Sequence, residues 1–551
     1  MLLSLRHHRR AVFMGLFLLL AVLYLAHIGA YHLIDPDEGR YHRIGMEMMQ
    51  TGDYVTPRLD GLLYFDKPAL PYWVTALSME IFGVHDFAGR VLPALSGLGN
   101  VLLAYALGRR MLGRRGALVA AVILATTALN LIVASIGVLD MALSFFLGAA
   151  LVSFYYFERA GQKKYLLGFY AAMALGMLTK GLIAIVFPVG IVLCYALLAR
   201  RPRLLRAFLY WPGILLFLVL ALPWYFLVCQ ANPDFFDYFF IREHFLRFVT
   251  KMHKRFHPWY YFLPVLVAGF VPWTGFLLSL FSKRGVVRQP GTPRRRLDVM
   301  FLLLWAGLIY LFFSVSDSKL PTYILPCWLP LSVLLAASLE RCRRLGVWLG
   351  HGFLVNALLC LLFSAAGVVF LLHTDYLSVP AFLRSGALLT ASLVLGTFLA
   401  AFVWHRKKSF LGVFLVLSLM SYGFGLGAHL VQGQIHEHQS SYPASEAIRS
   451  LGIGRDTPIV MYGRFMPGLI YYLDRPIAVA DLKGELEFGL SHPHEEGLYF
   501  SREELADIWQ SPRQVVIVMP PHCRGEMRWL LVTPPEKIIE RENFTILVNH
   551  I

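Results

Sequence analysis

The stretch Ala11–Ala30, AVFMGLFLLLAVLYLAHIGA, decides the fold class, and the acidic segment Asp35-Pro36-Asp37-Glu38 follows it almost at once. A predominantly apolar run of this length can cross a bilayer as one helix. A charged side chain at the centre of such a helix costs about 2.5–3.5 kcal/mol. Carboxylates gathered directly beside the run therefore indicate either a polar stop after a membrane anchor or a functional site at the membrane face.

Composition places the chain among integral membrane proteins. Of its 551 residues, 57% are hydrophobic and the mean hydropathy is +0.60, which excludes a soluble globular protein. The segment 166–180 is short for a span, and 69–84 could be a surface helix rather than a further crossing. We count about thirteen apolar segments of spanning length: 11–30, 91–108, 117–135, 140–157, 166–180, 182–199, 207–228, 259–281, 299–316, 321–339, 346–372, 384–404 and 410–430.

The net charge of +16 is distributed in a way that argues against a nucleic-acid partner. Basic clusters stand at junctions that each follow an even number of expected crossings, so a single topology puts all of them on one side. By the positive-inside rule that side is the cytoplasm. The intervening loops and the tail are then outside. The clusters are residues 6–10, 109–115, 159–164, 200–206, 283–296, 341–344 and 406–408.

The amino-terminal segment and the cysteines indicate neither a cleaved leader nor a disulfide-bonded fold. The first apolar run resembles a signal sequence but lacks a clear cleavage site, so we expect an uncleaved first span. The 6 cysteines are scattered without metal-ligand spacing and indicate no disulfide framework.

Two domains are expected. Residues 1–431 form a membrane domain with long outer loops at 31–90 and 229–258, and residues 432–551 form a more polar α/β domain on the outer side. In the tail, strands are predicted at 458–462, 514–519, 537–540 and 544–548, and helices at 466–473 and 501–510, the last with Ser501 as its N-cap. Prolines and glycines break the first long loop into short pieces, which favours amphipathic helices on the membrane surface.

Three carboxylates could act in catalysis: Asp37, Glu38 and Asp140. The topology puts all of them at the outer face. There, burial or a neighbouring charge could shift the pKa of one carboxylate so that it acts as a general base. Asp140 could equally cap the helix that it starts, because an acid at a helix N-terminus complements the helix dipole.

Cations among aromatic residues on the outer side point to a phosphate ligand. Lysine would act as a point charge and arginine as a bidentate donor. Each one alone could also be a simple headgroup contact. Tyr323, between prolines that fix a turn, would point its hydroxyl into the top of the bundle, whereas Lys180 is expected to snorkel. The outer basic and aromatic residues concerned are Arg40, Tyr41, Tyr64, Lys67, Arg247, Arg255 and Lys319.

A metal signal is weak. Glu243-His244 with Asp66 could bind a divalent cation, but no tight ligand spacing exists. No other cofactor is expected.

The ordered motifs resemble the GT-C glycosyltransferases that use polyprenyl-phosphate sugars, and among them the aminoarabinose transferase group. The resemblance covers most of the membrane region and the total length, and is carried by several motifs in family order: Pro36-Asp37-Glu38…Arg40-Tyr41, Gly52-Asp53, Tyr64-Phe65-Asp66-Lys67-Pro68…Tyr72-Trp73, Thr179-Lys180-Gly181, Pro258-Trp259-Tyr260-Tyr261 and Lys319-Leu-Pro-Thr-Tyr-Ile-Leu-Pro326.

The resemblance implies a polytopic α-helical enzyme in the bacterial inner membrane with a periplasmic active site. Asp37 would be the principal catalytic carboxylate and Asp140 a second. Lys67, Tyr323 and an arginine of the 242–255 loop would bind the carrier phosphate, so that these groups meet in one outer pocket. The family often has Glu where this chain has Asp66, which puts a shared cation site in doubt.

The activity implied is transfer of 4-amino-4-deoxy-L-arabinose from undecaprenyl phosphate to lipid A, with inversion expected by family analogy alone. The near alternative is a related transferase with another sugar or with a protein or glycan acceptor. A polytopic lipid or sugar transporter is the alternative from another class. Transporters place charge near the midplane, whereas here the charges stand at the outer rim.

Overall fold

The computed structural model describes residues 21–22, 24–26, 28–246, 257–283, 285–289, 291–345, 350–373, 379–482, 484–494 and 496–550. The chain divides into two units. The larger unit holds Met1–Ile28, Leu92–Leu227 and Phe236–Val431. The smaller unit holds Gly29–Val91, Val228–Phe235 and Gln432–Ile551, so it joins the whole of the first long loop to the tail.

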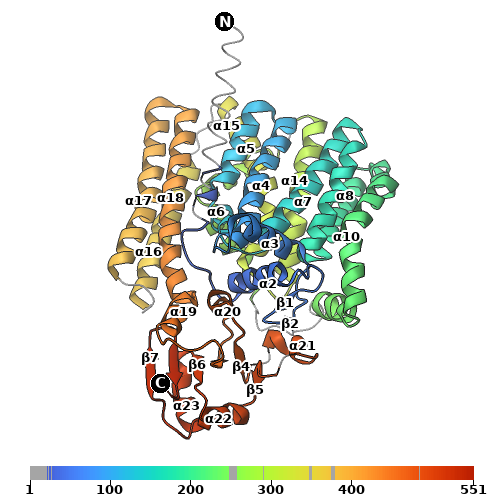
Figure 1. Ribbon diagram of the computed structural model, residues 1–551. Coiled ribbons are helices and arrows are strands. Elements are labelled where there is room, and N and C mark those ends of the chain that lie inside the picture. The colour runs from blue at the N-terminus through green and yellow to red at the C-terminus, as the bar shows by residue number, and fades with distance from the viewer. Residues whose placement is uncertain are drawn as a thin grey trace. The chain divides into compact units, whose positions relative to one another are not determined.

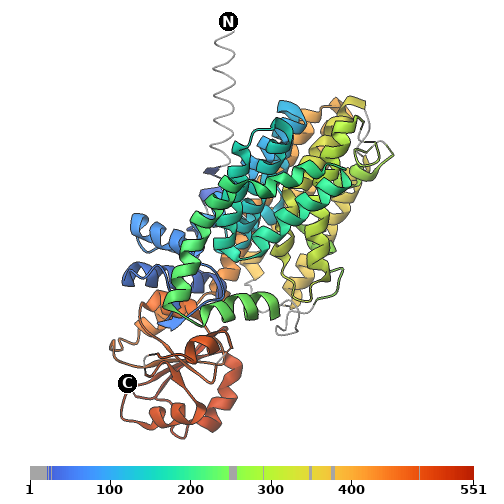
Figure 2. The ribbon, with the colours of Figure 1, turned by 90° about the vertical axis from the view of Figure 1, so that its right-hand side faces the viewer.

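The larger unit is helical, and its helices run side by side (Figures 1 and 2). Long apolar sequences without helix-breaking pairs account for these elements. Its helices are α4 (Val91–Met111), α5 (Gly113–Ala125), α6 (Ala128–Ala134), α7 (Asp140–Ala160), α8 (Lys164–Lys180), α9 (Ile183–Leu198), η2 (Pro202–Leu209), α10 (Trp211–Ala231), η3 (Asp237–Leu246), α12 (Phe262–Gly269), η4 (Thr274–Leu277), α13 (Leu278–Phe281), α14 (Pro293–Val315), η5 (Pro321–Cys327), α15 (Trp328–Leu345), α16 (Gly350–His373), α17 (Val379–Lys407) and α18 (Phe410–Gln439).

Within the described residues, 7 helices are long and apolar enough to cross a membrane, or up to 9 if each of two bent pairs is one span. The expected segment 117–135 is broken into α5 and α6, bent by 63°, and 259–281 is broken at Pro272 with a bend of 111°. The first expected span lies largely outside the described residues. The polytopic helical class is confirmed, while the count of thirteen is not.

The core of the larger unit is filled by large rings. Trp273, Trp305 and Trp328 are each at most 1% exposed, and α7 packs against α8, α9 and η5. Trp273 donates from Nε1 to the Thr126 hydroxyl, 2.9 Å away, so its polar atom is satisfied inside the bundle. Aromatic rings of this size dominate burial wherever they are enclosed.

The tail of the smaller unit is an α/β domain, as predicted. Its sheet has the strand order β5-β4-β3-β6-β8-β7, with β3 parallel to β4 and β6, and β8 antiparallel to β6 and β7. The strands and helices are β3 (Ile459–Tyr462), β4 (Ala478–Ala480), β5 (Tyr499–Phe500), β6 (Val516–Met519), β7 (Lys537–Glu540), β8 (Thr545–Val548), α19 (Tyr442–Arg449), α20 (Pro467–Leu473), η6 (Gly484–Leu486), α21 (Glu487–Leu490), α22 (Arg502–Gln510), η7 (Pro521–Cys523) and α23 (Arg524–Leu530).

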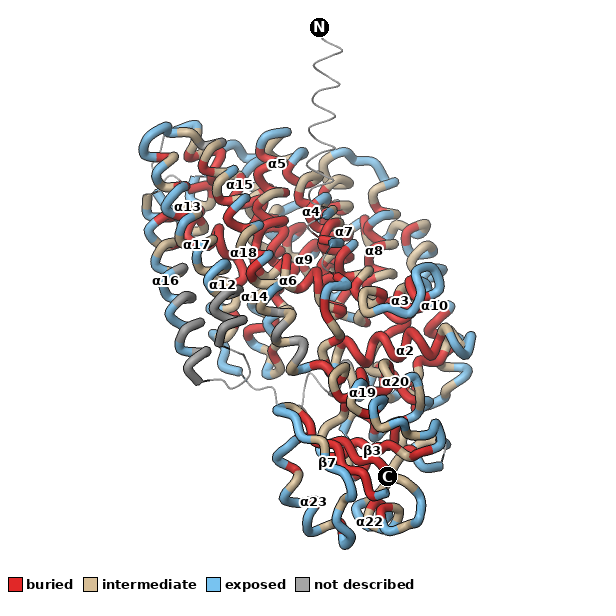
Figure 3. The backbone as a smooth tube through the Cα atoms, turned by 60° about the vertical axis from the view of Figure 1, so that its left-hand side comes forward, coloured by how far each residue is buried: buried red, intermediate tan, exposed pale blue. Residues whose placement is uncertain are grey.

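The sheet core explains why these strands form. All four residues of β3, β6 and β8 are buried, and Figure 3 shows this part of the tube as buried while α22 and α23 present exposed backbone outward. Trp509 of α22 is fully buried in that core. Ser501 and Glu504 form the predicted capping box at the start of α22.

The first loop contributes α2 (Asp37–Thr51), the hairpin β1 (Arg58–Leu59) and β2 (Leu62–Leu63), α3 (Leu70–Phe82) and η1 (Ala88–Arg90). The surface-helix expectation fits α3, whose Leu77, Ile81 and Phe82 are more than half exposed. It does not fit α2, which is buried on every face from Glu38 to Met48 because α3 and α20 pack against it. Gly39 permits that packing, since a Cβ there would lie 2.4 Å from the Gly468 nitrogen.

Candidate functional site

The three acids of the first loop, adjacent in sequence, have three different environments. Asp35 is 6% exposed and binds the tail: its Oδ1 accepts from the Gly468 backbone N–H at 2.6 Å, and its Oδ2 accepts from the Ser441 hydroxyl. Burial raises the pKa of Asp35 to about 6, although both hydrogen bonds act in the opposite direction. Asp35 therefore fastens the first loop to α19 and α20.

Glu38 is also inside the smaller unit. Its two oxygens face Nε and Nη2 of Arg90 at 2.7 Å each, and the Ile34 backbone N–H donates to Oε2 at 2.9 Å. Glu38 and Arg90 are 1% and 0% exposed. A paired, bidentate geometry of this kind satisfies a buried carboxylate. Glu38 was expected to act in catalysis, and this geometry makes it a support for the turn before α2.

Asp37 is the open member of the three. It is the first residue of α2, its side chain is 46% exposed, and its Oδ1 accepts from Nη1 of Arg40 at 3.1 Å. Arg40 is 9% exposed and also pairs through Nη2 with Oε2 of Glu485, 2.5 Å away, from η6 of the tail. Burial raises the pKa of Glu485, and the Arg40 guanidinium offsets part of that rise. One buried cation thus holds a half-exposed carboxylate.

Two tyrosines frame Arg40. The guanidinium carbon lies 5.6 Å from the ring centre of Tyr64 and 6.0 Å from that of Tyr41. The Tyr64 hydroxyl donates to Oδ2 of Asp66 at 3.2 Å. Burial raises the pKa of Tyr64 well above its ordinary value, and Asp66 adds to that rise, so the hydroxyl keeps its proton. Lys67 follows directly, and its Nζ donates to the Asp66 carbonyl at 2.8 Å.

A second polar group lies within the larger unit. Asp140 begins α7 and Lys180 ends α8, and the Lys180 Nζ lies 2.5 Å from Oδ1 of Asp140 and 4.8 Å from the ring centre of Tyr323 in η5. The side chains of Asp140 and Lys180 are 12% and 18% exposed. Lys180 was expected to snorkel, and this interpretation is wrong, because its ammonium group pairs with the carboxylate of Asp140 at the start of α7. The N-cap of α7 is Leu139, and Asp140 lies in the first turn, where its carboxylate also complements the helix dipole.

Lys319 has a different use from the phosphate ligand predicted. It is 2% exposed, and its Nζ donates to the His257 carbonyl at 3.0 Å and to the Ser316 carbonyl. Burial lowers the pKa of Lys319. Its ammonium group binds two backbone carbonyls. These bonds hold the turn that carries Tyr323 against the segment before α12.

Some predicted ligands fall outside the description. Arg247 and Arg255 lie outside the described residues, as does the side chain of His244. Among the residues that are described, no group of three or more His, Cys, Asp or Glu could hold a metal ion. The cation site of Asp66 and His244 therefore stays a prediction.

Sequence reasoning missed Glu485, Arg90 and the pairing of Lys180. Glu485 and Arg90 lie 445 and 52 positions from their partners Arg40 and Glu38, so no local spacing signals them. A signal did exist for Lys180. It ends one predicted span, and Asp140 begins another at the same face, so the two opposite charges could have been paired from the sequence.

Comparison with known proteins shows the family to which the chain belongs. Residues 66–226 match the dolichyl-phosphate-mannose-protein mannosyltransferase family, and residues 446–549 match the aminoarabinose transferase C-terminal domain. The chain is 27% identical to ArnT from Cupriavidus metallidurans, whose crystal structure was obtained bound to undecaprenyl phosphate, with a TM-score of 0.86 over 98% of both chains. Its apo structure gives 0.82 over the same coverage.

Two curated relatives carry one name, undecaprenyl phosphate-alpha-4-amino-4-deoxy-L-arabinose arabinosyl transferase. That of Edwardsiella ictaluri is 33% identical over 88% of this chain and 89% of its own. That of Aeromonas salmonicida is 32% identical over 96% of this chain and 97% of its own. The chain therefore belongs to the aminoarabinose transferase family, multi-pass membrane glycosyltransferases of the GT-C superfamily.

Proposed function

We propose that this enzyme moves 4-amino-4-deoxy-L-arabinose from undecaprenyl phosphate to a phosphate of lipid A, on the periplasmic face of the bacterial inner membrane. The names of its full-length relatives support the donor. The observation that carries the chemistry is the half-exposed Asp37 carboxylate, oriented by the buried Arg40.

In the reaction, the bond between the anomeric carbon and the carrier phosphate breaks, and undecaprenyl phosphate leaves with the electron pair. A new bond forms from the anomeric carbon to an acceptor oxygen. Negative charge grows on the leaving phosphate, and preorganised cations stabilise such charge most where water is excluded. We assign that work to Lys67, which the Asp66 carbonyl orients, with Arg247 and Arg255 as expected partners.

The role of Asp37 depends on the acceptor. A lipid A phosphate oxygen is already nucleophilic, so no proton needs removal, and Asp37 would orient the acceptor or stabilise positive charge on the sugar ring. A hydroxyl acceptor would need Asp37 as a general base, a role worth about 10²–10⁴ in rate. Glu38, whose oxygens are all engaged, supports the turn that presents Asp37.

We further propose that the group of Asp140, Lys180 and Tyr323 serves the same reaction. Residues that act as one catalytic unit give grossly non-additive losses of rate when changed together. A double-mutant cycle with Asp37→Asn and Asp140→Asn tests this assignment. If the two groups act as one unit, the double variant is hardly slower than the slower single variant. Multiplied losses would show that the two groups act independently and would overturn the shared unit.

The experiment for the overall proposal uses purified full-length enzyme in nanodiscs, a defined undecaprenyl-phosphate aminoarabinose donor and lipid A. Mass spectrometry of the lipid A should show an increment of one pentosamine, dependent on enzyme and donor. Parallel reactions with a hexose donor and with a peptide acceptor test the near alternative. Transfer of hexose without any aminoarabinose would overturn the proposed sugar. Transfer to peptide without any lipid A product would overturn the proposed acceptor.

A further inference from the structure

The helix α14 carries a groove that the transfer reaction does not use. The groove has a volume of about 810 Å³, and its floor is one apolar face of α14. Gly307 leaves that floor open, because a Cβ built there would meet nothing within 4 Å. Along the helix the floor consists of Met300, Leu303, Leu304, Gly307, Leu308 and Leu311.

One end of this groove is basic. Arg288 and Arg296 line it there and are both exposed, and none of the described residues that line the groove is acidic. Gln289 lines the same end, and Arg341 holds it through its backbone carbonyl and through Oε1, the latter at 3.1 Å from Nη2. This end of the groove therefore carries positive charge with no acid among its described lining residues, and Arg341 holds the backbone of Gln289 there.

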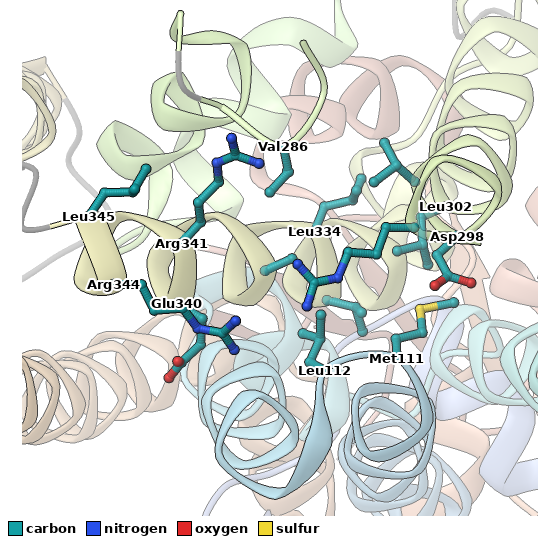
Figure 4. Close-up of a pocket in the computed structure, with 14 residues that line it drawn as sticks. Met111, Leu112, Val286, Asp298, Leu302, Leu334, Glu340, Arg341, Arg344 and Leu345 are labelled. Carbon is teal, nitrogen blue, oxygen red and sulfur yellow. The ribbon is translucent and has the colours of Figure 1, made fainter. Parts of the chain in front are cut away.

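A neighbouring pocket of about 210 Å³ provides a contrast (Figure 4), and it shares Val299 with the groove. It also holds arginines, but Asp298 and Glu340 line it too. Figure 4 shows Glu340 on the side of Arg344 and Asp298 on the opposite side. Mixed charge in that pocket gives an anion no clear preference, unlike the groove.

The groove also has the dimensions of a lipid chain. From Arg296 to Leu311 the helix advances about 22 Å at about 1.5 Å per residue. The hydrocarbon core of a bilayer is about 30 Å thick, so this length is sufficient for an acyl chain that starts at the headgroup level and spans one leaflet. The basic cluster 283–296 belongs on the cytoplasmic side by the positive-inside rule.

We propose that the α14 groove binds an anionic phospholipid of the cytoplasmic leaflet, with its phosphate at Arg288 and Arg296 and an acyl chain along the floor to Leu311. Basic side chains attract anionic headgroups, and apolar burial along the floor adds the chain's contribution. A zwitterionic lipid would gain the apolar burial of its chain but little attraction between its headgroup and the arginines. The site therefore selects for lipids with net negative charge.

The test is lipid retention by the full-length protein, measured by native mass spectrometry after release from nanodiscs that contain equal dioleoyl phosphatidylglycerol and dioleoyl phosphatidylethanolamine. The unchanged protein should keep phosphatidylglycerol in preference. The double variant Arg288→Gln, Arg296→Gln should lose that preference by about thirtyfold, since each basic residue near an anionic headgroup contributes about a fivefold factor. High salt should weaken retention of the unchanged protein, because exposed charges are screened.

Gly307→Trp tests the chain half of the site by filling the floor where space is open. It should lower retention while Arg288 and Arg296 stay in place. The matched control is Arg344→Gln in the neighbouring pocket, which should keep the preference for phosphatidylglycerol. If this control loses as much as the double variant, general surface charge explains the binding and the site is overturned.

Competition distinguishes a lipid from a free anion. Inorganic phosphate or glycerol 3-phosphate at millimolar concentration should not displace the retained lipid. Displacement by either would leave an anion site without a lipid chain and overturn the proposal. Equal retention of the two phospholipids by the unchanged protein would overturn it as well.

Discussion

The two units of this enzyme treat their outer acids in opposite ways. In the smaller unit, Asp35, Asp37 and Glu38 are sequence neighbours, yet two of them are buried supports and only Asp37 is substantially exposed. In the larger unit, Asp140 and Lys180 are 40 positions apart and form one pair at the ends of two helices. The three acids of the smaller unit are adjacent in sequence but differ in environment. Asp140 and Lys180 of the larger unit are distant in sequence but form an ion pair.

The difference teaches how to recognise the reactive group. A carboxylate whose oxygens are all taken by buried donors costs several kcal/mol to disturb and serves stability. A carboxylate held from one side by a buried arginine is oriented but still open to a substrate. By this criterion we propose Asp37 as the reactive acid and its neighbours as supports.

The sharpest test of this comparison is Asp37→Asn. We expect kcat to fall about 10³-fold, within the range typical of a positioned acid or base, with the melting temperature unchanged because the side chain is 46% exposed. Glu446→Gln on α19 is the matched control, since Glu446 is 51% exposed and pairs with Arg449 in the same i,i+3 spacing. Activity of Asp37→Asn close to that of this control would refute the assignment.

The buried neighbour Asp35 should behave differently, through stability and pH. Its pKa is about 6 in the folded protein against 3.8 unfolded, so the folded state binds the extra proton between these values. Stability is then full below about pH 4 and falls by about 3 kcal/mol as the pH rises through about 6. Asp35→Asn keeps a neutral group and should flatten this slope in pH-dependent thermal unfolding.

The control for that slope is Asp474→Asn, because the Asp474 side chain is 56% exposed, whereas that of Asp35 is buried. Its slope should match the unchanged protein. A steep slope retained in Asp35→Asn would show that another carboxyl group sets the pH dependence, such as Glu485, whose pKa burial also raises.

In the larger unit, Lys180→Met should lower kcat by about a hundredfold, since it removes the cation that holds Asp140 in position, and small misplacements of a catalytic group cost about that much. Lys180→Arg should recover most of the rate and so separate loss of charge from loss of fold. Lys164→Met, at the other end of α8 and 5.4 Å from the Tyr165 ring centre, is the matched control. Equal losses in both lysine variants would remove the special role of Lys180.

The smallest effect is expected for Glu485→Gln, about tenfold in kcat with KM little changed, since Glu485 positions Arg40 and touches no substrate in the proposal. Hydrogen bonds between charged groups contribute about 1.5–3 kcal/mol, and glutamine keeps part of the bond. The neighbouring exposed Glu487→Gln should leave kcat unchanged. A loss in KM alone would instead place Glu485 against the substrate.

Much of the fold was readable from the sequence. The strands β3, β6, β7 and β8 and the capped helix α22 were predicted within two residues of their observed bounds, because β-branched runs and capping pairs are local signals. The short strands β4 and β5 were missed. The helical membrane class follows from apolar length alone. The breaks at 126–127 and 270–273 were missed, because an apolar run does not reveal where its axis bends.

By itself, the sequence determined that the chain crosses a membrane repeatedly, that its tail is an α/β domain, and that acids, cations and aromatic residues stand together in the first long loop. Only the tertiary structure decided which acid is open. Asp35 is closed by Ser441 and Gly468, and Arg40 is shared between Asp37 and Glu485, through partners hundreds of positions away. Burial and pairing depend on such distant partners, and the local pattern of residues carries no record of them.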